Sequence, residues 1–274
     1  MASTESFQLE EAAAEAYEAK FVPAMFAEWA QQLVAAVGVS PGQRILDVAC
    51  GTGIVARTAA EIAGAGAVTG VDINPAMLAV AARVRPEISW VQGDAAALPV
   101  QDGTFDVVLC QMALMFFPDA VAALREMCRA AVDGGTVAVA VPGRLEDQPG
   151  YGPFVELVSR HAGSGAMSVL GAYWACGDLE ELKRLFAQAG FPEVESHTHI
   201  GKAKYSSAAD FVAVEVESTP LMARLTEDQL ASIHTEAAAV LQPFAEADGS
   251  LTVPLQGHLV LGHTSTGHGA RQAG

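Results

Sequence analysis

An aliphatic run, a glycine turn and the start of a helix follow one another directly in residues 45–60, ILDVACGTGIVARTAA. The run over 44–49 has the composition of a strand that is covered on both faces of a sheet. Gly51 and Gly53 leave the backbone free of side chains, and the helix that begins near Ile54 presents unpaired N–H groups. This order of elements predicts a buried strand of an α/β sheet with a site for a nucleotide-like ligand at its end.

Strand-like and helix-like segments alternate along the first half of the chain. Strands are predicted at 44–49, 67–72, 88–92, 105–111 and 136–141, with helices at 55–63, 75–83 and 120–132. Strands separated by helices of this length form parallel sheets with right-handed crossovers. This half is therefore predicted to be a doubly wound α/β domain.

Helical periodicity over 10–37, with a break expected near Pro23, places a helical segment before the first strand, where it can lie over the ligand. The later segments begin with a glycine- and proline-rich lid at 144–177, in which short helical stretches are expected, and a helix at 178–189 ended by Gly190. A strand at 193–200, helices over 208–247 and a last strand at 257–263 follow.

These segments predict four parts of the chain. They are an N-terminal helical cap (1–40), a core (41–204 and 256–264, with the lid at 144–177), a helical insertion (205–255) and a disordered tail (265–274). The insertion interrupts the core just before its last strand.

The chain carries 15 lysines and arginines against 32 aspartates and glutamates, a formal charge of -17 at pH 7. Such an excess of negative charge repels phosphate backbones and anionic lipids, so nucleic acid is not an expected partner. No apolar stretch reaches the roughly 18 residues that span a membrane. The acidic N-terminal segment lacks the basic start and apolar centre of a secretory signal. We therefore expect a cytoplasmic protein without membrane insertion.

Three polar side chains end later strands or follow them, at the sheet edge where ligands of open α/β sheets bind. Asp72 comes 21 residues after Gly51, the spacing at which a carboxylate accepts hydrogen bonds from a bound ribose. Asp94 follows Gly93 and can accept from an adenine amino group, although a turn or helix cap explains it equally well. Gln111 ends the fourth strand. Their joint placement indicates an adenosine-bearing ligand.

Cysteines and histidines form no catalytic motif in the sequence. The four cysteines are scattered and make no CxxC pair, which indicates free thiols. Cys50 is interpreted as a small packing residue rather than a nucleophile, because no histidine lies near it in the sequence. His161, in the predicted lid, is an open candidate for a base, and no metal site is expected. The Met- and Phe-rich segment 112–117 is compatible both with an apolar substrate pocket and with core packing.

Residues 43–141 resemble a known family, the class I S-adenosylmethionine-dependent methyltransferases, especially the group similar to ubiquinone and menaquinone methyltransferases. The likeness lies in LDVACGTG, VTGVDINPAML, GDAAALPVQDGTFDVV and LREMCRAAVDGGTVAVAV. It implies a Rossmann-like, doubly wound α/β fold with a mostly parallel seven-stranded sheet, an N-terminal helical cap and a helical insertion before the last strand. It also implies S-adenosyl-L-methionine as cofactor and S-adenosyl-L-homocysteine as product.

The resemblance implies a set of cofactor-binding residues. The set is Tyr17, Phe21, Asp47, Ala49, Gly51, Thr52, Gly53, Asp72, Ile73, Met77, Gly93, Asp94, Ala95 and Gln111. By family likeness, Gly51 and Gly53 flank the methionine portion, and Asp72 holds the ribose hydroxyls. Asp94 and Ala95 meet the adenine edge.

Other members of the set have roles implied in the same way. Ile73 and Met77 line the adenine pocket, and Gln111 lies near the methionine end. Tyr17 and Phe21 belong to a helix that covers the cofactor in this family. The implied reaction is in-line transfer of a methyl group to an O, N, S or C atom of a small, apolar or aromatic acceptor, with no catalytic residue assigned. A homodimer is also compatible with the resemblance.

Two alternatives remain open at the level of sequence. The segment GTGIVA also satisfies the glycine pattern of dinucleotide-binding proteins, in which Asp72 would hold a ribose equally well. Asp47 and Asp94 favour the methyl donor, because the methyltransferase family places acids there, and no tyrosine–lysine pair for hydride transfer is evident. A non-catalytic scaffold with the same fold is the second alternative.

Overall fold

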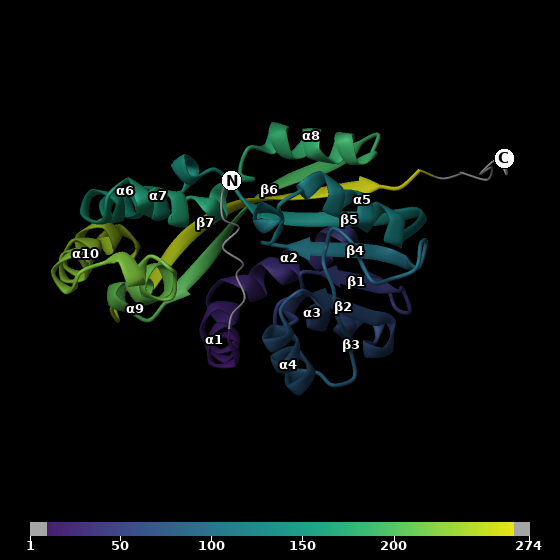
Figure 1. The fold of residues 1–274 in the computed structure, drawn as a ribbon, viewed down its shortest axis with the longest axis horizontal. Helices are drawn as coiled ribbons and strands as arrows, with labels where there is room; N and C mark the ends of the chain where they lie inside the picture. Colours follow the sequence, from purple (N-terminus) through teal and green to yellow (C-terminus); the bar gives the residue numbers. More distant parts are fainter. Residues whose placement is uncertain (1–9, 266–274) are drawn as a thin grey trace. The chain divides into compact units, whose positions relative to one another are not determined.

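The computed structural model describes residues 10–265, which contain a seven-stranded sheet with the strand order β3-β2-β1-β4-β5-β7-β6 (Figure 1). The strands are β1 (Ile45–Val48), β2 (Val68–Asp72), β3 (Ser89–Gln92), β4 (Phe105–Gln111), β5 (Ala131–Pro142), β6 (Val194–Tyr205) and β7 (Leu251–His263). This confirms the predicted doubly wound, mostly parallel α/β sheet. The predicted disordered tail lies outside the described residues, apart from its first residue.

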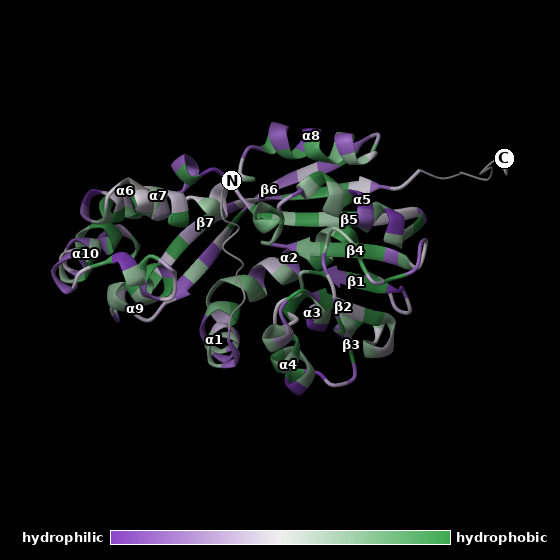
Figure 2. Ribbon diagram, in the orientation of Figure 1, coloured by the Kyte–Doolittle hydropathy of each residue, from purple (hydrophilic) through white to green (hydrophobic). Residues whose placement is uncertain are grey.

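The first five strands pair in parallel, β3 with β2, β2 with β1, β1 with β4 and β4 with β5. All four residues of β1 are buried, and Figure 2 shows hydrophobic residues along β1, β4 and β5, as expected for strands covered on both faces. The strand order reverses direction between β1 and β4. Ligands of open α/β sheets bind at such a switch point, next to the carboxyl ends of the strands.

The helices around these strands have capping residues at several of their ends. They are α2 (Ala27–Val37), α3 (Ile54–Ala63), α4 (Pro75–Val84), α5 (Ala120–Ala130) and α8 (Leu179–Ala189). The side chain of Asn74 caps α4 by accepting from the N–H of Ala76 at 2.8 Å, and that of Asp119 caps α5 in the same way. Gly38 ends α2 with a φ of 67°.

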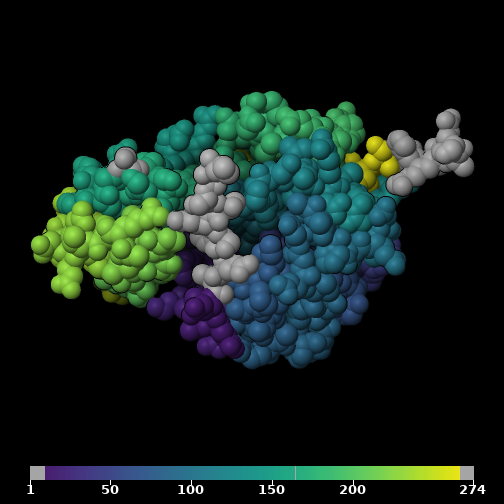
Figure 3. All heavy atoms as spheres, in the orientation of Figure 1, coloured from purple at the N-terminus to yellow at the C-terminus, as the bar shows by residue number. Residues whose placement is uncertain are grey.

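The N-terminal helix continues through Pro23, so the predicted break there is wrong. α1 (Glu11–Ala16) runs into a π-helical segment, η1 (Tyr17–Phe26), and then into α2. A π-helix pairs each N–H with the carbonyl five residues back, and this wider turn accommodates a proline ring that would clash in an α-helix. Arg83 of α4 donates to Glu11 and Glu15 of α1, each at 2.7 Å, and α1 lies against α4 in Figure 3.

The chain divides into two compact units. Unit 1 consists of the chain up to Val141, residues 180–197 and the chain from Leu259 onward. Unit 2 consists of 142–179 and 198–258. Strands β6 and β7 each contribute residues to both units, whereas β1 to β4 belong to unit 1 alone.

Unit 2 is built mainly from helices. Its elements are η4 (Leu145–Asp147), α6 (Tyr151–Ala162), α7 (Ser164–Leu170), η5 (Ala172–Trp174), α9 (Ala208–Val212), η6 (Ala213–Glu217), η7 (Met222–Arg224), α10 (Glu227–Leu241) and η8 (Gln242–Phe244). The helical stretches expected within 144–177 are η4, α6, α7 and η5, and Tyr151, Phe154 and Leu157 give α6 a buried face.

The last two strands are longer than the sequence predicts. β6 extends to Tyr205 and β7 begins at Leu251, six residues before the predicted start at Gly257. In the early part of β7 buried residues alternate with half-buried ones across Pro254, the residue that interrupts the sequence pattern.

Candidate functional site

A tight turn joins the carboxyl end of β1 to α3. Every second residue of this turn has a left-handed backbone conformation, with φ of 55° at Ala49, 56° at Gly51 and 87° at Gly53. Only glycine adopts this conformation freely, so Ala49 is strained, at a cost of about 1–3 kcal/mol. Met112, just after β4, has a φ of 51° and is the other strained non-glycine residue of the part described. Ala49 and Met112 directly follow the carboxyl ends of β1 and β4, which pair with each other.

Asp47 is buried in β1, with 1% of its surface exposed. One of its carboxylate oxygens accepts a hydrogen bond from the N–H of Ala56 in the first turn of α3, at 2.9 Å. Burial, helped by the charge of Asp72, raises the pKa of Asp47 to about 8. A cationic group placed beside it would favour its ionised form.

Asp72 connects the end of β2 to the glycine turn. Its Oδ2 accepts from the N–H of Gly51 at 2.7 Å, and its Oδ1 accepts from the N–H of Asn74 at 2.8 Å. Burial raises the pKa of Asp72, and these backbone hydrogen bonds oppose the rise. Each oxygen keeps capacity for a further donor, such as a sugar hydroxyl.

Gly53 has a structural role that the sequence motif does not show. A Cβ at this position would lie 2.2 Å from the indole of Trp90, and a Cβ on Gly70 would lie 2.4 Å from the same ring. The absent side chain therefore makes room for Trp90, and the role of Gly53 beside a ligand stays a prediction. A Cβ on Gly51 would instead meet the Tyr17 ring at 3.8 Å.

The π-helical segment lies against the glycine turn. Tyr17 stacks with Phe21 and Phe26, with ring centroids 5.6 and 5.3 Å apart. Burial and the nearby carboxylates, Asp72 first among them, raise the pKa of Tyr17 above its ordinary value. This places Tyr17, one of the predicted residues, beside the turn, and Phe21, another of them, against the Tyr17 ring.

An ion pair that the sequence analysis did not identify fixes this segment. Arg57 of α3 donates to Glu18 at 2.8 Å and to the carbonyl oxygen of Thr52 at 2.7 Å. The two residues are 39 positions apart, so no local pattern could have revealed the pair. By contrast, the Asn74-Pro75 pair that begins α4 is a recognisable capping signal.

Two buried polar atoms near the turn have no hydrogen-bond partner within residues 10–265. They are Oγ1 of Thr52 and Oε1 of Gln111. Gln111 is oriented by its own amide, whose Nε2 donates to the carbonyl oxygen of Phe26 at 3.1 Å. Buried polar atoms without partners are costly, so their presence at this edge is consistent with a polar ligand.

The end of β3 leads into a turn that carries Asp94 and Ala95. Asp94 is exposed, and its Oδ1 accepts from the N–H of Ala96 at 2.9 Å. Ile73, predicted beside adenine, is 51% exposed. Met77 packs with Ala14 under the N-terminal helix.

The remaining candidates of the sequence analysis have structural partners. Cys50 is a buried free thiol whose pKa is raised well above the ordinary value by burial, which suits packing rather than nucleophilic attack. His161 pairs with Glu236 of α10, with Nε2 and Oε1 at 2.8 Å. No described residues form a group of three or more potential metal ligands. None of the described helices is long and apolar enough to cross a membrane.

Unit 2 contains a hollow of about 480 Å³. Its apolar wall includes Met167 and Trp174, and its rim carries the ion pair between Arg144 and Asp178. Trp174 lies 5.2 Å from the ring of Tyr151, which belongs to the buried core of the unit. The volume is within the range of small-molecule sites.

A buried hydrogen-bonded chain supports that core. The hydroxyls of Tyr151 and Tyr205 are 2.8 Å apart, and the Tyr205 hydroxyl donates to Glu215 at 2.8 Å. Burial raises the pKa of Glu215 to about 7. Phe211 packs against both tyrosine rings.

Residues 45–135 match the sequence profile of a family described as "Methyltransferase domain". The chain is 41% identical over 126 residues to a demethylmenaquinone methyltransferase of Renibacterium salmoninarum, covering 46% of this chain and 51% of that protein. It spans about half the length of the curated relatives that it matches at 40 or 41% identity.

A longer match gives the family relationship. A demethylmenaquinone methyltransferase of Staphylococcus aureus is 31% identical over 193 residues, covering 63% of this chain and 78% of that protein. Among solved structures, phosphoethanolamine N-methyltransferase 2 of Haemonchus contortus in complex with S-adenosyl-L-methionine has a TM-score of 0.60 at 20% identity, over 95% of this chain and 59% of that one. This last likeness is one of fold.

Proposed function

The chain belongs to the methyltransferase family that includes the demethylmenaquinone methyltransferases, and we propose that it transfers a methyl group from S-adenosyl-L-methionine to a small-molecule acceptor. The observation that carries the proposal is the pair of buried carboxylates, Asp47 and Asp72, hydrogen-bonded to α3 and to the glycine turn. They lie at the carboxyl edge of the sheet, next to the switch between β1 and β4.

The polar groups at this edge suit the two ends of the cofactor. Asp72 has the acceptor capacity for the ribose hydroxyls. Oε1 of Gln111, buried without a partner in the described chain, and the carboxyl of Asp47 suit the ammonium of the methionine portion. Asp94 and Ala95 are proposed for adenine. Tyr17 and Phe21, whose rings stack on each other, are proposed to exclude water from the cofactor.

The demands on this chain during methyl transfer are modest. When bound, the cofactor supplies an electrophilic methyl group on a sulfonium centre. The protein must hold an acceptor atom in line with that group, and alignment of this kind is worth about 7–11 kcal/mol in favourable systems. A general base is needed only for an acceptor that must lose a proton. In the protein without cofactor, burial raises the pKa of Asp47 to about 8, so this carboxyl is mostly protonated, and not a base, at lower pH.

We propose an apolar or aromatic acceptor, selected in part by residues of the predicted lid (144–177) and helical insertion (205–255). The names of the relatives support a quinone precursor or a similar ring compound. The formal charge of -17 disfavours nucleic acid as the acceptor. A cytoplasmic location and a homodimer remain part of the proposal, and sedimentation equilibrium tests the dimer.

Thermal unfolding with added ligands tests the cofactor. At about 100 times its dissociation constant, S-adenosyl-L-methionine should stabilise the wild type by about 2.7 kcal/mol. Asp72→Ala should lose most of this shift, because the ribose hydroxyls lose their acceptor. Asp106→Asn is the matched control, since that carboxylate accepts from the N–H of Arg44 just before β1, away from the glycine turn.

S-adenosyl-L-homocysteine should stabilise the wild type in the same way, and NADH should not. Stabilisation by NADH alone would contradict the proposal and favour a dinucleotide enzyme. An Asp72→Ala variant that keeps the full shift would show that the carboxylate is not part of the site.

A further inference from the structure

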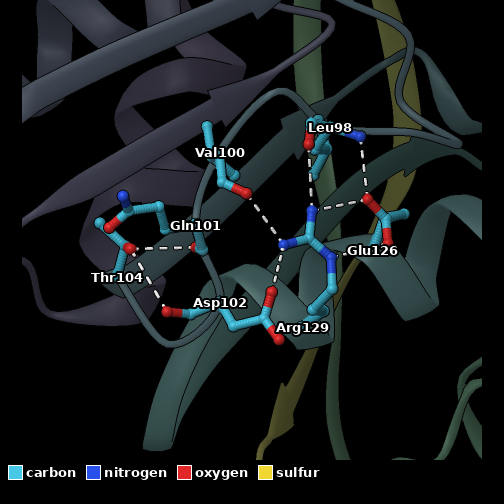
Figure 4. A network of polar contacts seen from close by, with 7 residues as sticks. All are labelled: Leu98, Val100, Gln101, Asp102, Thr104, Glu126 and Arg129. Carbon is cyan, nitrogen blue, oxygen red and sulfur yellow. Dashed lines mark hydrogen bonds and ion pairs between the residues drawn. The ribbon is translucent and has the colours of Figure 1, made fainter.

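Arg129 of α5 makes an unusually complete set of contacts with the loop between β3 and β4 (Figure 4). Its Nη1 donates to the carbonyl oxygen of Val100 at 2.9 Å and to Asp102 at 2.8 Å. Its Nη2 donates to the carbonyl oxygen of Leu98 at 3.0 Å and to Glu126 at 2.7 Å, and its Nε donates to the other oxygen of Glu126 at 2.8 Å. One guanidinium thus holds three successive parts of the loop.

Glu126 also binds the backbone of Leu98. It accepts from the backbone N–H of Leu98 at 2.9 Å, so the N–H and the carbonyl of that residue are both bound by the Arg129–Glu126 pair. The Leu98 side chain is buried, with 5% of its surface exposed. The pair with Arg129 lowers the pKa of Glu126, which keeps the carboxylate ionised and its hydrogen bonds charge-assisted.

The segment just before Leu98 is a small closed turn. Ala97 forms a β-bridge with Asp94, and its N–H donates to the carbonyl oxygen of Asp94 at 3.0 Å. A Cβ on Gly93 would lie 2.5 Å from the ring of Pro99, so the two ends of the turn touch. The position of this turn is therefore set by Leu98 and Pro99, and Arg129 and Glu126 bind the backbone on either side of Pro99, at Leu98 and Val100.

The turn carries Asp94 and Ala95, the residues proposed for adenine. The side chain of Asp94 accepts a local hydrogen bond from the N–H of Ala96, and Asp94 is exposed. Fixing a turn of this kind requires anchoring at its base, and buried or charge-assisted hydrogen bonds provide it. The backbone adds one more connection, since the carbonyl of Arg129 accepts from the N–H of Gly103 at 2.9 Å.

We propose that Arg129, with Glu126, is a positioning residue that sets Asp94 and Ala95 in place to recognise the adenine base, without itself touching the cofactor. The inference rests on the proposed function. It predicts that loss of the guanidinium weakens the discrimination between purine bases more than it weakens nucleoside binding in general.

The test compares S-adenosyl-L-homocysteine with S-inosyl-L-homocysteine, which has a carbonyl in place of the adenine amino group. By isothermal titration, the wild type should prefer the adenine ligand by about tenfold or more, the value of one good hydrogen bond. Arg129→Met should reduce this preference at least fivefold. Arg125→Met is the matched control, because Arg125 lies on the same helix and donates to the carbonyl of Gln188, away from the loop.

Arg129→Lys and hydrogen exchange keep the test informative if the methionine variant folds poorly. A lysine cannot bind three acceptors in the fork geometry of a guanidinium. In the ligand-free protein, the amides of Ala97 and Leu98 should exchange at least tenfold faster in Arg129→Lys than in Arg125→Met.

Several outcomes would overturn the inference. One is an unchanged adenine preference in Arg129→Met or Arg129→Lys, and another is unchanged amide exchange. Equal weakening of both ligands would give Arg129 a merely structural role. If the wild type bound neither ligand, the proposed function would fail as well, and the exchange data would still report whether Arg129 holds the turn.

Discussion

Single residues of the glycine turn combine structural and binding roles. Gly51 donates its N–H to Asp72, whereas Gly53 leaves room for the Trp90 indole. A sequence motif of two glycines cannot separate these uses, because the partner of Gly53 comes from a strand 37 positions later. Asp72 was identifiable because its spacing from Gly51 places it at the carboxyl edge of the sheet, whereas Asp47 was assigned through the family resemblance.

Substituting two glycines that are both in left-handed backbone, Gly38 and Gly53, separates the steric role of Gly53 from its conformation. Gly38 has a φ of 67° with open space around it, so Gly38→Ala should cost only the left-handed conformation, about 1 kcal/mol. Gly53→Ala should destabilise by about 1–3 kcal/mol more, because its Cβ overlaps the Trp90 ring. Urea unfolding of the two variants measures the difference, and equal losses would exclude the clash.

The raised pKa of Asp47 predicts a dependence of stability on pH. Its ordinary value is 3.8 and its folded value about 8, so the folded protein binds more protons than the unfolded chain between these pH values. Its contribution to stability is therefore fully present below pH 4 and is lost as pH rises towards 8. Asp47→Asn removes the titration. The fall in unfolding free energy from pH 5 to pH 8 should be smaller in the variant, and an equal fall would contradict this assignment.

At the scale of elements, the sequence was most informative where hydrophobic patterns are short and local. The predicted strand 105–111 coincides with β4, and β1, β2 and β3 end within one residue of their predicted ends. In 144–177 the sequence predicted a lid with short helical stretches, and the extent of α6, which contains Gly152 and Pro153, could not be derived from that pattern. Long-range packing overrides these local preferences, as the buried face of α6 illustrates.

The elements of unit 2 meet at the Tyr151–Tyr205–Glu215 chain, which joins α6, β6 and η6. Tyr205→Phe removes the central hydroxyl and leaves two buried groups without their partner, so it should destabilise by about 1–3 kcal/mol. Chemical unfolding at pH 6 measures the loss. A variant as stable as the wild type would show that the chain contributes nothing to the core.

Glu215→Gln is the companion variant. The pKa of Glu215 is raised from 4.5 to about 7, so its contribution is present below pH 4.5 and lost as pH rises through 7. The glutamine still accepts a hydrogen bond from Tyr205 but does not titrate. The free energy of unfolding of the variant should therefore rise relative to that of the wild type as the pH rises from 5 to 8.

At the scale of the whole molecule, the family match and the second unit occupy different parts of the chain. The methyltransferase profile covers residues 45–135, which belong to unit 1. Unit 2 consists of residues 142–179 and 198–258. No sequence motif predicted its hollow or its buried tyrosines. The fold and the kind of cofactor were therefore predictable from sequence, whereas the residues assigned to the cofactor stay a prediction. The acceptor was not predictable, because no local pattern in the segments of unit 2 identifies it.

The central claim is that the carboxyl edge of β1, β2 and β4 binds S-adenosyl-L-methionine, and a crystal structure of the protein with S-adenosyl-L-homocysteine tests it most directly. The ribose hydroxyls should lie within hydrogen-bond distance of Asp72, with the ammonium beside Gln111 and Asp47. A nucleoside bound elsewhere, or no bound nucleoside at saturating concentration, would contradict the claim.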